Sequence, residues 1–494
     1  MYKAVNKSLF FLMCLISLLC LNVFSPSLAI SAKDGISKAV PGSMAEKFPK
    51  PKAAYDASKM GDMSGFNPDT WVPPTGDTIK IAIFAPYSGP ASYNGDFTWA
   101  EAAWGAYDIN QRGGIWVDGK KKLIQLLKAD TMSREDQCRK VAERMVLKEK
   151  VHFFWGTPGS NMTKILSAVA AKYKIIHANA HGLSDDLQDQ ENFSRYQFMT
   201  GTNVSQVGRA IAYYYGQIRK KEKKFYILCQ DYSFGREVAA GFKQGLKEHY
   251  PEAEIVGEDY HKLFLTDYAP YMTKIVASGA EVLFTGDWPP DSILLLKQAR
   301  QYNINIPIAN LYLDAPDVLR DVGVEGTRGL VHFNQIATPP PLFKDDGYKK
   351  FHKAWVKQYD DVWSKTTKFG NIAYKHGHGI APFTMQFYWL LSVIERAKST
   401  DPEKIIATWE NDVYQYPNGK VVMMRACDHR AVQDYIVEEY VAPEDQKISY
   451  NIPPYFWHKE CSYAGPGYLI PAAMVFPRID PKSDRCKDKN GWGE

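Results

Sequence analysis

The chain of 494 residues lacks the short motifs that would assign it to a common enzyme class. It has no Gly-x-Ser-x-Gly, His-Glu-x-x-His or Gly-x-Gly-x-x-Gly pattern, and the loop over 156–160 lacks the Lys-Ser or Lys-Thr ending of a P-loop. An enzyme would have to rely on isolated residues such as His181, His376 or Asp287. We therefore expect no catalytic residues, no cofactor and no enzymatic activity.

Cysteine is scarce, and its spacing excludes two kinds of chemistry. None of the seven cysteines forms a Cys-x-x-Cys pair, which disfavours structural zinc and thioredoxin-like redox sites. Cys461 and Cys486 lie in a loop-rich tail and are the favoured disulfide pair, with Cys427 a rival partner for either. Cys229 lies within an apolar run and is predicted to be buried and inert.

Long apolar runs are absent after the first thirty residues. Lys3 and Lys7 precede an apolar run over 9–23, and small residues at Ser27 and Ala29 suit a signal peptidase. We predict a cleaved signal peptide over 1–29 and a periplasmic or otherwise extracytoplasmic location. A lipid anchor at Cys20 is the alternative, although Leu19 stands where a small residue is expected.

Charge of one sign is also lacking. The formal net charge is +5, and removal of the two lysines of the leader leaves about +3. Such a balance does not indicate nucleic acid or an anionic membrane as a partner. Aromatic residues, by contrast, make up 13% of the chain, enough to fill cores and also to line an apolar cleft.

The body of the chain alternates short strands with helices. Residues 30–77 form a Pro-, Gly- and Lys-rich lead that we interpret as an extended arm. From residue 78 onward, strands are expected at 79–84, 123–127, 151–155 and 175–178, with helices at 97–110, 134–148 and 162–173. This alternation predicts a parallel sheet that is covered on both faces.

A second run of the same kind begins after residue 202. Helices are expected at 205–218, 234–250, 269–278 and 291–302, and strands at 225–229, 254–260, 282–285, 307–311 and 329–333. A further helix is predicted over 383–397. Two such runs predict an α/β protein with two doubly wound, Rossmann-like lobes. Ligands of such sheets bind at the carboxyl ends of the strands, so the loops after the strands matter most.

At those loops the sequence resembles a known family. The segments 85–95, 108–115, 155–160 and 231–235, followed by 425–430, resemble type I periplasmic solute-binding proteins of ABC importers, and most closely the leucine/isoleucine/valine-binding group. Each segment alone is only weakly specific for this family. Their order and spacing over roughly 77–440 make the resemblance more specific.

The resemblance implies a fold and a function. Lobe 1 would span 78–200 plus 334–428, lobe 2 would span 201–333 plus 429–476, and a tail would follow over 477–494, with a three-strand hinge between the lobes. The protein would be a monomer that closes over a small molecule and delivers it to an ABC permease in a transient contact. A sensor of the same fold that signals to a membrane receptor is the alternative.

The loop over 156–160 is the best candidate contact. It lies between a strand and a helix start, where free backbone N–H groups favour an anion or a carbonyl oxygen. Ser160 aligns with the family serine that meets the ligand's carboxylate, and Gly159 precedes it. Ser160 could instead, or in addition, cap the helix.

The other candidate contacts come from the same alignment. Tyr93 and Asn94 lie in the first loop, and His181 and Leu183 stand where amino-acid binders carry small polar residues. Ser184 could take the place of Leu183 after a slip of one residue.

In the second lobe, the alignment places aromatic residues in the cleft. Phe234 and Trp288 match ring positions, and Tyr312 replaces the acid that holds the ligand's ammonium group in the family. Unless Asp314 or Asp287 supplies that charge, this pattern favours a small carboxylate, amide or aromatic compound over leucine, isoleucine or valine.

The pair His376 and His378 follows Lys375 in a glycine-rich stretch. A metal site would need further ligands, which are not apparent nearby, so a solvated loop is the favoured interpretation and no metal is expected.

Overall fold

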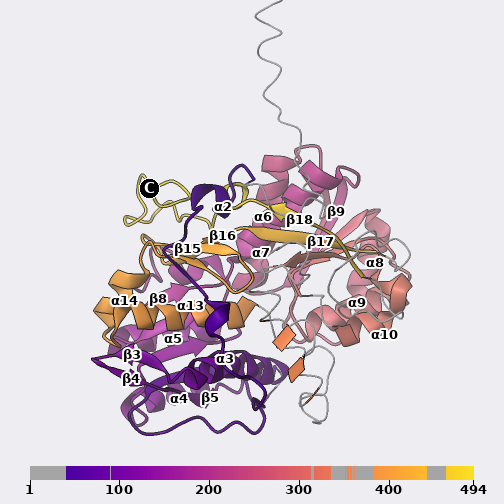
Figure 1. Ribbon diagram of the computed structural model, residues 1–494. Coiled ribbons are helices and arrows are strands. Elements are labelled where there is room, and N and C mark those ends of the chain that lie inside the picture. The colour runs from indigo at the N-terminus through magenta and orange to yellow at the C-terminus, as the bar shows by residue number, and fades with distance from the viewer. Residues whose placement is uncertain are drawn as a thin grey trace, which may run out of the picture.

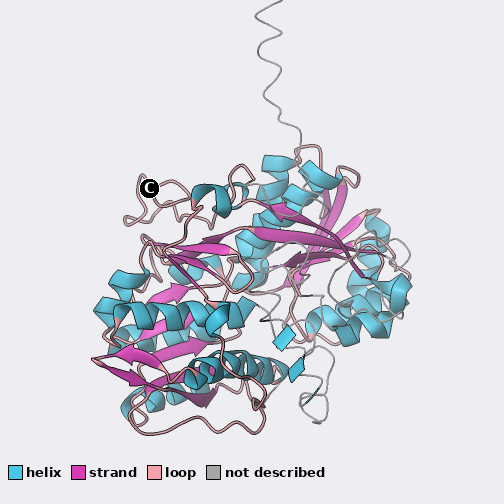
Figure 2. Ribbon diagram, viewed as in Figure 1, coloured by secondary structure: helices cyan, strands magenta, loops and turns pink. Residues whose placement is uncertain are grey.

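The computed structural model describes residues 40–89, 91–312, 316–334, 382–441 and 463–494, together with 351, 353–354, 357–358 and 361. Within these residues the chain builds two large sheets and one small hairpin. Figures 1 and 2 show the two sheets as separate halves, each with helices packed against it. None of the described helices is long and apolar enough to cross a membrane.

The first sheet has nine strands. They are β1 (Ala53–Ala54), β2 (Ile79–Ala85), β5 (Ile124–Asp130), β6 (Phe153–Gly156), β7 (Ile176–Asn179), β8 (Gln197–Met199), β14 (Val413–Gln415), β15 (Val421–Arg425) and β16 (Arg430–Gln433). Their order is β1-β14-β15-β16-β8-β7-β6-β2-β5, parallel except for the antiparallel pairs β14–β15 and β15–β16. Its helices are α3 (Tyr93–Gln111), α4 (Glu135–Leu147), α5 (Ser160–Tyr173), α13 (Pro382–Ala397) and α14 (Pro402–Trp409).

Both faces of this sheet are buried. In β2, Ile81 and Ile83 point into the core shared with α3 and α13, whereas Ala82 and Phe84 point into the core shared with α4 and α5. Successive side chains of a strand point to opposite faces, so a continuous apolar run is what a doubly covered strand requires. The parallel, doubly covered sheet that the sequence predicts is confirmed.

The second sheet has seven strands. They are β9 (Lys224–Gln230), β10 (Glu254–His261), β11 (Val282–Phe284), β12 (Ile308–Asn310), β13 (Val331–Asn334), β17 (Tyr435–Val441) and β18 (Tyr463–Ile470). Their order is β10-β9-β11-β12-β13-β17-β18, with β17 and β18 antiparallel to their neighbours. Its helices are α6 (Val204–Tyr213), α7 (Ser233–His249), α8 (Ala269–Ser278), α9 (Asp291–Gln301) and α10 (Pro316–Thr327).

Alternate side chains of the central strand β9 again point to opposite faces of the sheet. Phe225, Ile227 and Cys229 of β9 pack with α6 and α7, whereas Tyr226 and Leu228 pack on the opposite side with α8 and α9. Cys229 is buried and unbridged, as predicted. Burial raises the pKa of its thiol well above the ordinary value, which keeps the sulfur unreactive.

In the described residues the chain passes between the sheets after β8, after β13 and between β16 and β17. Strands β15 to β17 run across the middle of the molecule in Figure 1. β16 still belongs to the first sheet, so the strands place this last change of lobe between Gln433 and Tyr435, later than the boundary expected after residue 428. The other expected lobe boundaries stay predictions.

Several short elements were not predicted. They are the hairpin β3 (Ile115–Val117) and β4 (Lys120–Lys122), the strand β8, the helix α14, the antiparallel strands near the C-terminus and the 3-10 turn η2 (Asp185–Gln188). Helix α3 begins at Tyr93 instead of 97. The helix expected over 205–218 ends its α-helical part at Tyr213 and continues as a π-helical turn, η3 (Tyr214–Arg219).

The N-terminal lead packs against the first half of the molecule. Phe66 is fully buried in the core that includes α3 and α13, and β1 adds an edge strand beside β14. The Tyr55 hydroxyl donates a hydrogen bond of 2.9 Å to Asp108 of α3, and the Trp99 indole donates one of 2.9 Å to the Pro68 carbonyl. The described lead therefore covers the first sheet and its helices and is part of their core.

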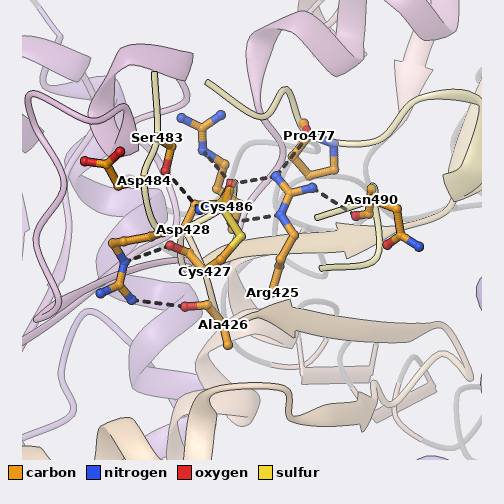
Figure 3. The surroundings of a disulfide bond; sticks show 12 residues. Arg425, Ala426, Cys427, Asp428, Pro477, Ser483, Asp484, Cys486 and Asn490 are labelled. Carbon is orange, nitrogen blue, oxygen red and sulfur yellow. Dashed lines mark hydrogen bonds and ion pairs between the residues drawn. A yellow bond between two sulfur atoms is a disulfide. The ribbon is translucent and has the colours of Figure 1, made fainter. Parts of the chain in front are cut away.

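The disulfide prediction is wrong in its partner. Cys486 is bonded to Cys427, with the two Cα atoms 5.2 Å apart, whereas Cys461 lies outside the described residues. Figure 3 shows the residues around this disulfide. Buried Arg425 donates hydrogen bonds to the carbonyls of Pro477 and Gly491, so the C-terminal tail folds back over the turn between β15 and β16 where Cys427 lies.

Candidate ligand-binding site

A cavity lies between the two halves of the molecule, at the carboxyl ends of several strands. It is lined by Asn94, Phe97, Thr98, Glu101, Pro158, Gly159, Ser160, His181, Tyr232, Phe234, Trp288, Pro289, Tyr312 and Phe383. Its volume is about 80 Å³. One water molecule needs about 10–15 Å³ on this scale, so the space suits a small organic molecule.

One wall of the cavity is a face of helix α3. Asn94, Thr98 and Glu101 are four and three residues apart, a spacing that places side chains on one side of a helix, and Phe97 lies beside them. The Thr98 hydroxyl donates a hydrogen bond of 2.8 Å to the Asn94 carbonyl. Asn94, Thr98 and Glu101 thus form the polar side of α3 that lines the cavity. Trp104 and the alanines of the helix lie in the core.

The start of helix α5 forms the floor of the cavity. Gly159 precedes the helix with a φ of 91°, a conformation that glycine adopts without strain. Ser160 is the first helical residue and is 1% exposed. It does not cap the helix, which corrects one alternative from the sequence; its hydroxyl oxygen accepts the Ser184 N–H at 3.3 Å. The first N–H groups of α5 have no partner within the helix and can meet a ligand oxygen.

His181 lines the cavity from the loop after β7. Its ring stacks on Phe383 with centroids 3.9 Å apart, and its Nε2 lies 3.4 Å from the Thr98 hydroxyl. Its Nδ1 is buried and has no hydrogen-bond partner in the described part of the chain. Burial lowers the pKa of His181 to about 3, so the ring is neutral at physiological pH.

Aromatic rings supply the opposite wall. Phe234 lies in the first turn of helix α7, Trp288 follows β11 and Tyr312 follows β12, so all three come from the second half of the molecule. The Trp288 indole donates a hydrogen bond of 2.8 Å to the hydroxyl of Tyr232, whose ring stacks on Phe234 at 5.8 Å. These contacts hold the rings in fixed orientations around the cavity.

Glu101 is the acidic residue among the described residues that line the cavity, and the sequence did not single it out. It is 1% exposed, and neither carboxyl oxygen has a hydrogen-bond partner among the described residues. Burial raises the pKa of this carboxyl well above its ordinary value. Among the described residues that line the cavity there is no Lys or Arg to pair with it. One signal could have revealed it: a lone acid between Trp99-Ala100 and Ala102-Ala103 in a helix facing the first loop.

Two of the predicted contacts have a different outcome. Leu183 does not line the cavity: it is 1% exposed and packs in the hydrophobic core with Val204 and Val207 of α6. Tyr93 is the first residue of α3, and its side chain lies outside the described part. The structure brings together Asn94, Gly159, Ser160, His181, Phe234, Trp288 and Tyr312 around one cavity, and their contact with a ligand stays a prediction.

Asp287, one of the two acids considered as substitutes at Tyr312, does not line the described cavity. The Asp287 carboxylate is buried and accepts a hydrogen bond of 2.7 Å from His261, behind the cleft wall. Asp314, like Lys375, His376 and His378, lies outside the described residues. Of the described residues, Cys427, Asp428 and Cys486 group as potential metal ligands, but the disulfide leaves no thiolate in that group.

A second set of contacts joins the two halves beside the cavity. Glu237 of α7 accepts the N–H groups of Asp185 and Asp186 at 2.5 and 3.2 Å, from η2 on the other half. The hydroxyls of Ser184 and Ser233 are 3.1 Å apart. Burial, and then the neighbouring Asp185 and Asp186, raise the pKa of Glu237 to about 8. These contacts join the two halves next to the cavity, and the Glu237 carboxyl is the titratable group that takes part in them.

This arrangement, two doubly wound lobes around a cleft, can be compared with known proteins. The sequence profile of the periplasmic binding proteins matches residues 78–445, most of the chain. The chain belongs to the periplasmic binding protein family. A Leu/Ile/Val-binding protein homolog from Brucella melitensis is 23% identical over 373 residues, covering 74% of this chain and 84% of the relative.

Solved structures of periplasmic binding proteins share the fold. The leucine-, isoleucine-, valine-, threonine- and alanine-binding protein of Brucella ovis, in a closed conformation, is 18% identical with a TM-score of 0.66 and covers 83% of this chain and 99% of its own. A solute-binding protein of an ABC transporter from Rhodopseudomonas palustris, in complex with 3,4-dihydroxybenzoic acid, is 18% identical with a TM-score of 0.65, covering 80% and 98%. Members of this family are binding proteins, and the periplasmic binding protein fold predicted from the sequence is confirmed.

Proposed function

We propose that this protein is an extracytoplasmic solute-binding protein that captures a small organic ligand in the cleft and delivers it to an ABC importer. The observation that carries the proposal is the cavity itself. Rings of Phe234, Trp288 and Tyr312 from one lobe face the Ser160 loop and α3 of the other, so a bound molecule contacts both lobes at once. Such a ligand stabilises the closed arrangement of the lobes.

The lining limits the chemistry of that ligand. An apolar cleft with a few fixed polar groups is the usual form of a small-molecule site. The rings suit a flat or apolar body, and the start of α5 with Ser160 suits a carboxylate or carbonyl oxygen. Relatives named for amino acids and for an aromatic acid are consistent with an amino acid-like, carboxylate, amide or aromatic ligand.

Export and partners complete the proposal. The leader over 1–29 directs the protein across the membrane and is removed, and the mature protein acts as a monomer. It meets a membrane permease only transiently. The formal charge gives no reason to expect nucleic acid as a partner.

The test is to identify what the protein carries. Protein purified under mild conditions is denatured, and the released small molecules are measured by mass spectrometry. We expect one organic species in about equimolar amount from the wild type and its loss from Trp288→Ala, because the indole forms part of the cleft wall. A species that both proteins retain equally would place the binding site elsewhere.

A further inference from the structure

The cleft contains a carboxyl group that the protein itself leaves without a partner. Both oxygens of Glu101 are buried and make no hydrogen bond in the described residues. A buried polar group without a partner costs about 1–3 kcal/mol, and more if it is charged. A group kept at that cost inside a ligand cavity has its natural partner in the ligand.

The surroundings of Glu101 select the kind of partner. The described lining offers the rings of Phe97, Tyr232, Phe234, Trp288, Tyr312 and Phe383, and no Lys or Arg. Aromatic faces attract cations, and a carboxylate accepts hydrogen bonds from them. The buried Nδ1 of His181 is a second atom without a partner in the same cavity. Aromatic faces offer no such attraction to an anionic group of a ligand.

We propose that Glu101 binds an ammonium group of the ligand, so that the ligand of this cleft is a small organic amine whose apolar body lies among the rings. This inference rests on the proposed function and narrows it. The acid that the family alignment loses at Tyr312 would be supplied from the opposite lobe, by helix α3. The ammonium could belong to a simple amine or to an amino acid whose carboxylate meets the start of α5.

The proposal predicts that binding is linked to proton release. Burial raises the pKa of the Glu101 carboxyl and therefore favours its protonated form when the cleft holds no ligand. An adjacent ammonium group favours the ionised carboxylate, and the proton leaves to solvent as the amine binds. The uptake or release of protons can be read from calorimetry in two buffers that differ in ionisation enthalpy.

Three ligands with the same phenyl group and chain test which charged group the cleft binds. Phenethylamine carries the ammonium alone, phenylalanine carries ammonium and carboxylate, and 3-phenylpropanoate carries the carboxylate alone. Each is titrated by calorimetry into the wild type, Glu101→Gln and Asp96→Asn. Asp96 is a carboxylate of the same helix that does not line the cavity, which makes its amide variant the matched control.

We expect at least one of the two amines to bind the wild type and Asp96→Asn alike, with release of a proton, and to bind Glu101→Gln roughly tenfold or more weakly with no proton release. Melting temperatures check that each variant is folded. If phenethylamine and phenylalanine both fail to bind, or bind Glu101→Gln as well as the wild type, the inference is overturned. Binding of 3-phenylpropanoate alone would also overturn the inference that Glu101 binds an ammonium group. The proposed function would still stand, because it is tested separately by identifying the molecule released from the purified protein.

Discussion

At the scale of single residues, the cleft shows a conflict between stability and binding. Glu101 is an acid in an otherwise apolar part of α3, and no described group compensates its burial. Residues that are kept for ligand binding commonly reduce the stability of the ligand-free protein. We therefore expect that replacing Glu101 by an apolar residue stabilises the ligand-free protein and weakens ligand binding.

The substitution Glu101→Met tests that expectation. We expect the free energy of unfolding of the ligand-free protein to rise by about 1–3 kcal/mol, because an unpaired buried polar group is replaced by an apolar one of similar length. Urea unfolding followed by circular dichroism measures it, with Asp96→Asn as the comparison on the same helix. A clear loss of stability in Glu101→Met would show that the carboxyl has a stabilising partner within the protein.

Half of the described residues that line the cavity were candidates from the sequence, for a definable reason. Gly159, Ser160, His181, Trp288 and Tyr312 follow strands of parallel sheets, and strand order brings such loops to one edge. Glu101 was missed because it lies in the third turn of helix α3, not in a loop. Leu183 lies two residues after the lining residue His181, and its packing in the core against α6 is a tertiary contact that the local sequence does not indicate.

At the scale of elements, the C-terminal tail is attached to the first lobe by one covalent bond and by the hydrogen bonds of Arg425 (Figure 3). The bond links residues 59 apart in the sequence. A crosslink of that span restricts the unfolded chain considerably. The tail is therefore expected to contribute to the stability of the lobe.

Removal of the bridge by Cys486→Ser should lower the free energy of unfolding by about 2–4 kcal/mol. Peptide mapping without reduction should recover the peptide pair that contains Cys427 and Cys486. Cys461→Ser is the control, because the sequence had favoured that residue as the partner, and it should leave this peptide pair intact. Recovery of a Cys461–Cys486 pair from the wild type would contradict the structure.

The contact of α7 with η2 should make stability depend on pH. The pKa of Glu237 is raised to about 8, mainly by burial and then by Asp185 and Asp186. An acid whose pKa is raised by folding stabilises the protein below its unfolded pKa, and this contribution is lost as pH rises through the folded value.

Between about pH 5.5 and 8.5, the wild type should therefore lose more unfolding free energy than Glu237→Gln, by about 1 kcal/mol or more, since one pKa unit corresponds to about 1.4 kcal/mol. Urea titrations of both proteins at the two pH values measure the difference. Parallel pH dependence in the two proteins would mean that Glu237 does not titrate in this range.

Elements with strong local patterns were predictable, and those that depend on distant partners were not. The helices α7, α8 and α9 lie within one residue of their expected bounds, because apolar periodicity marks them locally and Gly279 ends α8. No bounds were predicted from the sequence for strand β8 or for the strands β14 to β18. β8 and β14 are three residues each, and β17 is defined by pairing with β13, about a hundred residues earlier in the chain.

At the scale of the whole molecule, two lobes, each with its own cores, meet around one cleft and are linked by strand crossings such as that between β16 and β17 (Figure 1). A ligand that contacts both lobes binds the folded protein and not the unfolded chain. At a free concentration of about 100 times the dissociation constant it should add about 2.7 kcal/mol to the free energy of unfolding. Thermal melts with and without the released ligand would show this as a rise in melting temperature, and an unchanged melting temperature at saturation would contradict it.

The central claim is that the lobes close over a small molecule held in the cleft. Small-angle X-ray scattering of the wild type, first without ligand and then saturated with the molecule released from the purified protein, tests it most directly. We predict a smaller radius of gyration in the saturated sample, because the rings of one lobe and α3 of the other approach the same ligand. Saturated binding with an unchanged radius would contradict the account.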